Sequence, residues 1–325
     1  TVGEQMLYEI LDPGAYILPD VILDLRNVKL KQVDENKVLV TGAKGRAPTK
    51  YLKVSGIYLD GYKMTGQLVI GGIDAWRKAA AVAHAILTKT RVLFTKLGLS
   101  QYRNVNVEVL GAEHTYGSSR RFKRLKVFWD GTCSSTSMAP GITGSGAGRP
   151  HPSPCLVHFA CLISKDLVPS FITVGNKLAQ TVIFDGPTHN GNTIPPPLPE
   201  FSNKVYDEIS SGAMIKVPLI KLAWGRSGDK GDVCNIGILA RESKYYPFLK
   251  ISLTEEAVKD YMIHLCKGVV KRYKLPGCNG LNFVLTRCLD GGGLSSLNVD
   301  KQGKTYAQML LSFKVDVPSS FFAKL

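Results

Sequence analysis

The chain has 325 residues, of which 44% are hydrophobic and 21% are charged, and these values are ordinary for a folded globular protein and exclude a fibrous or disordered chain. The sequence contains no stretch of about 18 consecutive apolar residues, so it predicts no transmembrane helix. Lys and Arg number 41 against 26 Asp and Glu, which gives a net charge of +15. This excess favours acidic partners, namely nucleotides, coenzyme A, anionic lipid or acidic proteins.

The first half of the chain predicts a mixed sheet with one long helix. The helix is expected over residues 74–97, where apolar residues recur at helical spacing and Gly98 suits the C-terminal cap. Its apolar stripe consists of Trp76, Ala79, Ala80, Ala83, Leu87 and Phe94. Apolar runs bounded by turn residues predict strands within residues 8–46, 50–59, 67–70, 105–110 and 124–129.

Two irregular segments interrupt the chain. Residues 133–154 are rich in Gly, Ser, Thr and Pro and predict a long loop, which is either a flexible connector or an anion-binding loop. Residues 185–213 include three consecutive prolines, which form an extended and semi-rigid linker. We therefore divide the chain into a central α/β segment at 1–184, the linker at 185–213 and a second domain at 214–325.

The second domain predicts one layer of helix on an antiparallel sheet, an α+β arrangement. Its expected strands cover residues 217–224, 233–240, 281–287 and 306–317. Thr254 is a suitable N-cap for the one expected helix, because its hydroxyl can accept a hydrogen bond from the first turn. The predicted buried face of that helix consists of Ala257, Tyr261, Leu265 and Val269.

Residues 224–232 concentrate chemically active side chains, and we expect them to form one short loop that joins two of these strands; we call them the signature segment. Their glycines allow close backbone approach to a ligand, and their cations suit a phosphate or carboxylate. The alternative is a salt-bridged surface turn. The ligand-binding candidates here are Arg226, Ser227, Gly228, Lys230, Gly231 and Asn235, and the candidate acid–base residues are Asp229 and Asp232.

Two further groups of residues are candidates for a site. Asp290, Gly291 and Gly292 form either a loop beside a phosphate or a tight turn, and Lys304 is a further ligand-binding candidate. A second candidate cluster has four carboxylates near turns, which suit acid–base chemistry, a hard cation or simply the end of a strand. It consists of Glu9, Asp12, Asp20 and Asp24.

Cysteine usage favours a reducing compartment, the cytoplasm or the mitochondrial matrix. The seven cysteines are odd in number and include no Cys-x-x-Cys motif. The four residues with spacing nearest to a zinc site are His151, Cys155, His158 and Cys161. On a strand, His158 points away from the face that the two cysteines share, so we expect no metal.

No zinc finger or RNA-recognition motif accompanies the basic run at residues 120–126, and we expect no nucleic-acid binding.

Several motifs in order resemble the acyclic terpene utilisation AtuA family. The signature segment and its continuation to residue 241 resemble the family's C-terminal domain, as do residues 275–277, 281–285, 289–293 and 300–311. Residues 8–21, 40–48 and 71–75 resemble its central segment, and residues 140–144 resemble a further loop of the family. The resemblance implies a ferredoxin-like fold for the second domain. The chain begins inside a family motif, so we expect a fragment, a processed product or half of a split protein.

The resemblance implies a role in the breakdown of branched terpenoids as coenzyme A esters. We expect a protein that binds a branched acyl-CoA or a similar anionic metabolite. No cofactor is certain, and the sequence does not indicate a reaction or whether the protein is an enzyme. The alternative is a non-catalytic structural or interaction subunit of an acyl-CoA carboxylase or another mitochondrial assembly. In either case we expect a protein partner or the missing N-terminal half, and self-association of the chain alone.

Overall fold

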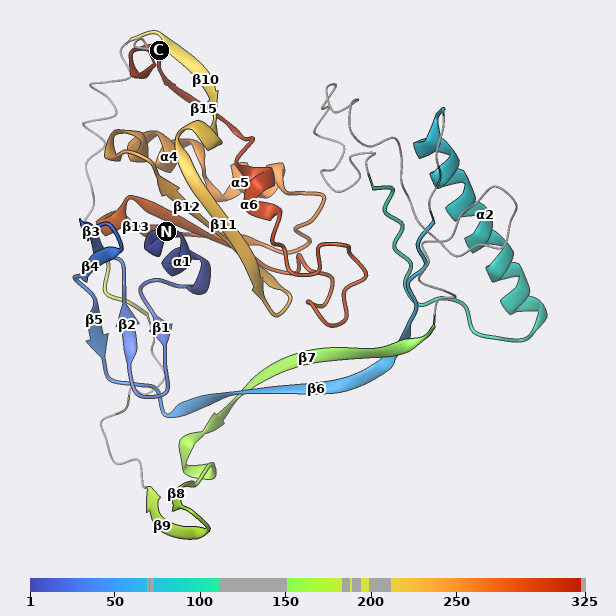
Figure 1. Cartoon of the computed structure of the whole chain (residues 1–325), viewed down its shortest axis with the longest axis horizontal. Helices are drawn as coiled ribbons and strands as arrows, with labels where there is room; N and C mark the ends of the chain where they lie inside the picture. Colours follow the sequence, from blue (N-terminus) through green and yellow to red (C-terminus); the bar gives the residue numbers. More distant parts are fainter. Residues whose placement is uncertain are drawn as a thin grey trace. The chain divides into compact units, whose positions relative to one another are not determined.

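Figure 1 shows the computed structural model of the chain. It forms two compact units, each assembled from segments that are distant in sequence. The first unit contains Thr1–Ile57, His158–Gly293 and Gln302–Leu325, and the second contains Tyr58–Val157 and Leu294–Lys301. The structure describes residues 1–68, 70, 73–110, 151–182, 188, 194–198 and 212–322. The expected strand at 124–129, most of the loop at 133–154 and most of the linker at 185–213 lie outside the described residues.

The centre of the first unit is a four-stranded antiparallel sheet in the order β11-β12-β14-β13. Its strands are β11 (Ala223–Lys230), β12 (Val233–Ala240), β13 (Val270–Leu275) and β14 (Gly280–Leu285). Alternate side chains of each strand point to opposite faces. One face is fully apolar at its centre, where Ile236, Ile238 and Phe283 have no exposed surface. Burial of such side chains contributes roughly 2 kcal/mol each.

Three short helices belong to the core of this apolar face. They are α4 (Tyr246–Ser252), α5 (Glu255–Tyr261) and α6 (Tyr306–Leu310). The Thr254 cap is confirmed, because its Oγ1 accepts a hydrogen bond from the Ala257 amide at 3.1 Å. The predicted buried face is only partly correct: Tyr261 and Leu265 pack against the core while partly buried, whereas Val269 is 57% exposed. The fully buried residues are Val258 of α5 and Met262, which follows its end.

Two expected strands of this domain are divided in the structure. The first breaks at Pro218: β10 (Met214–Pro218) pairs with β15 (Lys314–Pro318), and a short 3-10 turn leads into β11. The second, at residues 306–317, begins with helix α6 and only then becomes β15. In both, a continuous apolar run was interpreted as a strand, and periodicity does not distinguish such a run from a buried helical turn.

Helix α1 (Val2–Glu9) packs on the other face of the sheet, against β11 and β12 (Figure 1). Its start is a capping box, in which Thr1 and Glu4 bond to each other's backbone amides. Leu7 is 1% exposed and clusters with Leu239 and Leu275. The expectation of strands from residue 8 is therefore wrong at its start, where Tyr8 is helical.

The remainder of residues 8–46 forms short strands as expected. They pair as a three-stranded sheet, β1-β2-β5, and a hairpin, β3-β4. Another hairpin, β8-β9, follows much later in the chain. The bounds are β1 (Tyr16–Ile17), β2 (Ile22–Asp24), β3 (Lys29–Asp34), β4 (Lys37–Thr41), β5 (Lys44–Arg46), β8 (Ser170–Val174) and β9 (Lys177–Val182).

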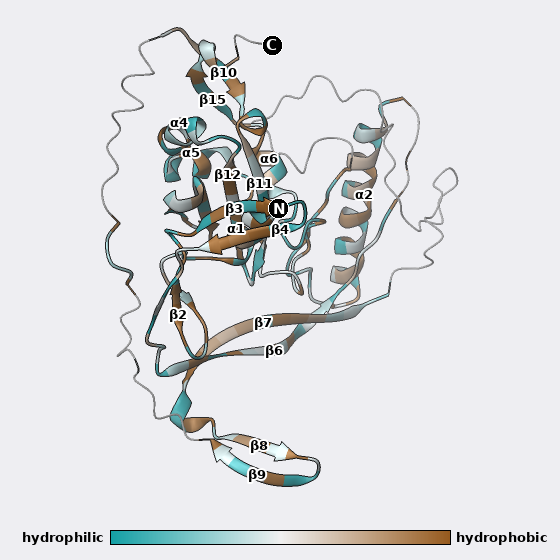
Figure 2. Cartoon of the chain, turned by 60° about the vertical axis from the view of Figure 1, so that its left-hand side comes forward, coloured by the Kyte–Doolittle hydropathy of each residue, from teal (hydrophilic) through white to brown (hydrophobic). Residues whose placement is uncertain are grey.

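The long strands β6 (Tyr51–Lys63) and β7 (Ser153–Ser164) pair as a two-stranded ribbon. Figure 2 shows that β7 is hydrophobic along much of its length. Phe159 lies against Gly56 of β6, where an added Cβ would come within 2.5 Å of the ring. The strand expected at residues 50–59 is thus confirmed and extended.

The second unit holds helix α2 (Ala75–Lys96), which confirms the predicted helix. Gly98 has a φ of +65°, as the expected cap requires. The buried stripe is shifted, since Ala75 and Ala79 are buried whereas Trp76 is 49% exposed. The described residues 67, 68, 70 and 105–110 are irregular rather than strands, and their buried members Leu68, Ile70 and Val109 form a small core with Ala79. No helix among the described residues is long and apolar enough to cross a membrane.

Candidate functional site

The signature segment is strand rather than loop for most of its length. Residues up to Lys230 belong to β11, and only Gly231 and Asp232 form the turn to β12. Gly231 has a φ of +73°, typical of the first turn residue in a tight hairpin. The loop expectation is wrong because polar and glycine-rich residues here pair with β12, from Lys230 opposite Val233 to Ala223 opposite Ala240.

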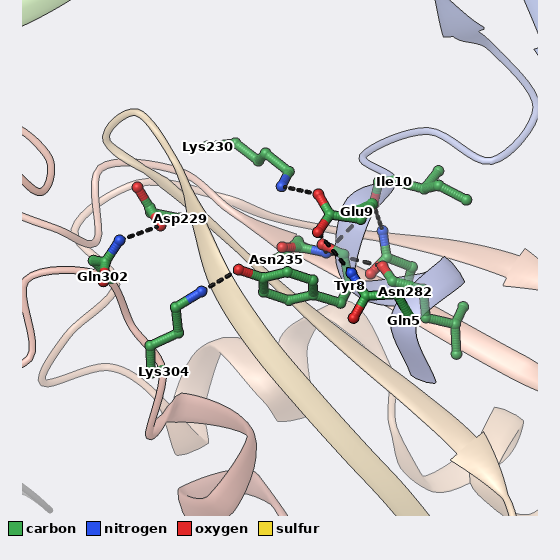
Figure 3. Close-up of polar contacts among 11 residues, drawn as sticks. Gln5, Tyr8, Glu9, Ile10, Asp229, Lys230, Asn235, Asn282, Gln302 and Lys304 are labelled. Carbon is green, nitrogen blue, oxygen red and sulfur yellow. Dashed lines mark hydrogen bonds and ion pairs between the residues drawn. The ribbon is translucent and has the colours of Figure 1, made fainter. Parts of the chain in front are cut away.

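The strand places the two signature cations beside one aromatic ring of α1. The Arg226 guanidinium carbon lies 4.7 Å from the centre of the Tyr8 ring, and Lys230 Nζ lies 5.0 Å from it. Lys304 Nζ lies 4.3 Å from the same centre and donates a hydrogen bond to the Tyr8 hydroxyl (Figure 3). Three predicted ligand-binding cations therefore meet at Tyr8, and each is positioned for a cation–π contact.

The carboxylates do not neutralise this group completely. Lys230 forms an ion pair with Glu9 at 3.1 Å, and Glu9 also accepts a hydrogen bond from Gln5 (Figure 3). Among the described residues, no carboxylate lies within ion-pair distance of Arg226, and its guanidinium donates no hydrogen bond to them. Arg226 is exposed. Its donors thus remain available to an external anion.

Glycines of the sheet allow α1 to lie this close. A Cβ on Gly228 would come within 2.2 Å of Tyr8 Cε2, and one on Gly237 would come within 2.5 Å of Leu7 Cβ. Such separations do not occur between real side chains, so both positions require glycine in this packing. In the structure the glycines therefore accommodate the chain's own helix, whereas the sequence argument assigned close approach to a ligand.

Two buried asparagines fix the C-terminal end of α1. Asn235 Nδ2 donates to the carbonyls of Leu7 at 3.0 Å and Tyr8 at 2.7 Å. Asn282 Nδ2 donates to Ile10 at 2.6 Å and to Leu11 at 2.8 Å. Helices end with carbonyls that lack partners within the helix. Asn235 supplies partners for two of these carbonyls, and Asn282 fixes the two residues that follow α1.

Ser227 positions the third cation from the opposite face of β11. Its hydroxyl donates to the Gly303 carbonyl at 2.6 Å and accepts a hydrogen bond from the Ala307 amide at 2.8 Å. Ser227 is only 2% exposed. It thereby anchors the segment that carries Lys304 and the start of α6.

The two candidate acid–base residues have different environments. Asp232 Oδ1 accepts hydrogen bonds from the Leu289 and Gly291 amides, both at 3.0 Å. Asp229 Oδ1 accepts one from Gln302 Nε2 at 3.3 Å (Figure 3). Asp232 therefore occupies backbone amides at the 290–292 loop that a phosphate could otherwise bind. Asp229 is the less constrained of the two carboxylates.

The residues of the 290–292 loop form a tight turn close to the β11–β12 hairpin. Asp290 pairs with Lys267 at 2.8 Å and has a φ of +54°. A Cβ on Gly292 would come within 2.9 Å of the Gly231 carbonyl oxygen. The loop and the hairpin turn are thus in direct contact.

The four carboxylates of the second cluster are dispersed. Glu9 pairs with Lys230, Asp12 accepts a hydrogen bond from the Gly14 amide at 2.8 Å, and Asp20 is exposed. Asp24 is buried and pairs with Arg26 at 2.5 Å. Burial acts to raise the pKa of Asp24, but the hydrogen bonds and charge of Arg26 outweigh it and lower that pKa.

The histidines and cysteines form no metal centre in the part of the chain that is described, where no three His, Cys, Asp or Glu side chains are grouped to hold an ion. Cys155 is buried on β7, whereas Cys161 is exposed. Burial raises the pKa of the Cys278 thiol to about 11. Cys133 lies outside the described residues.

Two protein-family models match this chain. Residues 1–174 match the model of the acyclic terpene utilisation family protein AtuA, and residues 217–316 match the AtuA ferredoxin-like domain. The chain belongs to the acyclic terpene utilisation AtuA family. Its C-terminal domain is ferredoxin-like, which confirms the expected α+β class. No curated protein and no solved structure matched the chain.

Tyr8 is the residue that sequence reasoning missed in this AtuA-family chain. The capping box at Thr1 and Glu4 was a readable signal for a helix, and it would have placed Tyr8 on α1. Nothing in the sequence indicates that this helix packs against β11.

Proposed function

We propose that this AtuA-family protein binds an anionic metabolite at the Arg226–Tyr8 pair. One observation supports this most strongly: an exposed guanidinium lies against an aromatic ring, with no carboxylate of the described chain within ion-pair distance. A guanidinium held flat in this way presents paired donors that match a carboxylate or phosphate. Lys230 and Lys304 add positive charge beside it.

A branched acyl-CoA is the metabolite class that we propose. The family name links the chain to acyclic terpenes, and a coenzyme A ester combines such a carbon skeleton with several phosphates. Asp229 is the proposed acid–base group, because its carboxylate accepts a single hydrogen bond, whereas that of Asp232 accepts two from backbone amides. The other candidates would have a structural role and keep these side chains in position. They are Gly231, Asn235, Asp290, Gly291 and Gly292.

Ligand-induced stabilisation tests this proposal. Coenzyme A should raise the melting temperature, because a ligand that binds only the native state stabilises it. Replacing both Arg226 and Lys230 with Ala should abolish that rise. Replacing Lys314, an exposed cation on β15, with Ala is the matched control and should leave the rise unchanged. Absence of any rise with millimolar coenzyme A would remove this ligand class.

A second candidate function is that of an interaction subunit. The β8–β9 hairpin is exposed throughout its first strand, and Phe171 and Val174 are 57% and 70% exposed. A two-stranded hairpin is marginally stable alone and gains stability by packing. We propose that an apolar surface of a partner protein covers it. Replacing Phe171 and Val174 with Ser should abolish self-association or partner binding in light scattering, and unchanged assembly would contradict this candidate.

A further inference from the structure

A second guanidinium lies on an aromatic ring at the other end of β11. The guanidinium carbon of Arg241 is 4.7 Å from the centre of the Trp224 ring, the same separation as between Arg226 and Tyr8. Arg241 Nε donates to the Ile220 carbonyl at 3.1 Å, which fixes the plane of the group. The terminal nitrogens of Arg241 donate to none of the described residues.

A hollow of about 420 Å³ lies beside this second pair. It is lined by Ile220, Lys221 and Arg241, and Ile220 is 47% exposed. Within the described chain, neither Lys221 nor Arg241 forms an ion pair. The hollow thus has two uncompensated cations and an apolar wall.

The backbone positions that carry the two pairs are close together on β11. Trp224 and Arg226 are two residues apart on one face of the strand, which corresponds to about 7 Å along it. Helix α1 packs against this strand, but β11 is at the edge of its sheet, and Arg226 and Arg241 are both exposed. A backbone spacing of this size is within the span of one extended ligand.

Charge indicates the class of ligand. The hollow carries the two cations Lys221 and Arg241, and neither forms an ion pair within the described chain. A carboxylate supplies one negative charge, whereas a phosphate monoester carries −1.5 to −2 at neutral pH and so matches both cations.

We infer that the hollow at Arg241 and Lys221 is a second anion subsite, which binds a phosphate of the same ligand whose other anionic group binds at Arg226. This inference rests on the proposed function. The ligand class is a metabolite with phosphates at two separate positions, such as a nucleotide bisphosphate moiety. The Trp224 indole and Ile220 provide apolar contact between or beside those phosphates.

Calorimetric titration with two probes tests the subsite. Inorganic phosphate reports a single anion position, and adenosine 3′,5′-bisphosphate reports both. Arg241→Ala should weaken bisphosphate binding about tenfold or more, as expected for a lost charge-assisted contact, and leave the stronger phosphate site unchanged. Arg226→Ala should weaken both probes. Lys314→Ala is the control.

The results separate the subsite from the proposed function. If Arg241→Ala binds bisphosphate as the wild type does, the subsite is overturned while the Arg226 site stands. If the wild type binds neither probe, both are overturned. Because Arg241 also bonds to Ile220, Lys221→Ala provides a second variant whose exposed side chain can be removed without a loss of packing. It should weaken bisphosphate binding severalfold, and an unchanged affinity would likewise contradict the subsite.

Discussion

The Arg226 guanidinium lies against the Tyr8 ring, with 4.7 Å between its carbon and the ring centre, although the two residues are 218 positions apart in the chain (226 − 8). This contact joins α1 to the edge strand of the ferredoxin-like sheet. It depends on glycines that admit the helix, on asparagines that hold its end and on a serine that places Lys304.

Gly228→Ala should destabilise the protein and weaken anion binding together. The added methyl group would come within 2.2 Å of Tyr8 Cε2, so the ring and the cations around it must shift. Overpacking of this kind costs roughly 1–3 kcal/mol. Gly212→Ala is a matched control, since no atom lies within 4 Å of its added Cβ. Chemical denaturation and phosphate titration measure both effects, and a neutral Gly228→Ala would show that Tyr8 does not pack here.

Asn235→Ala should cost about 1–3 kcal/mol of the free energy of unfolding, because it leaves buried carbonyls of Leu7 and Tyr8 without donors. Asn282→Ala should have a similar cost, since it serves Ile10 and Leu11. Hydrogen exchange should show faster opening of α1 in both variants. Protection of α1 equal to that of the wild type would contradict the role of these two asparagines in holding the end of α1.

Asp229→Ala and Asp232→Ala should separate function from stability. Asp229 has one long hydrogen bond to the exposed Gln302, so its removal should change the free energy of unfolding by less than about 1 kcal/mol and impair binding or activity. Asp232 holds two backbone amides of the neighbouring loop, and its removal should cost roughly 2–3 kcal/mol. Denaturation midpoints of the two variants measure these losses of stability. A larger loss for Asp229→Ala than for Asp232→Ala would contradict a structural role for Asp232 and a functional role for Asp229.

Asp24→Asn should destabilise the protein by about 3 kcal/mol at neutral pH, because it leaves Arg26 buried without its carboxylate. The folded-state pKa of Asp24 lies below its ordinary value of 3.8. Its contribution is therefore complete above that value and is lost as the pH falls through the lowered pKa. The difference between wild type and variant should shrink below pH 4. A difference that persists unchanged at pH 2 would contradict the ion pair.

Local sequence patterns predicted the position of several elements. Helix α2 and strands β6 and β12 appear where apolar spacing and cap residues placed them. Continuous apolar runs were ambiguous, so the turn at Leu219–Lys221 and helix α6 were interpreted as strand. The signature segment was interpreted as a loop because its glycines and charges are rare in strands.

The candidate site was only partly predictable, since it depends on contacts between distant segments. Arg226, Lys230 and Lys304 were identified by residue type, and the structure brings all three to Tyr8. Their common partner could not be found from spacing, because it lies on a helix at the other end of the chain. The carboxylates at positions 9, 12, 20 and 24 looked like a cluster in sequence, yet each has a separate local environment.

A crystal structure of the protein with diphosphate tests the central claim most directly. The account predicts an anion bound to the terminal nitrogens of Arg226 at about 2.7–2.9 Å, the usual length of a charge-assisted hydrogen bond. The guanidinium should remain against the Tyr8 ring, with Lys230 or Lys304 in contact with the same anion. Diphosphate bound elsewhere, with Arg226 turned away from Tyr8 to pair with a carboxylate of the protein, would contradict the account.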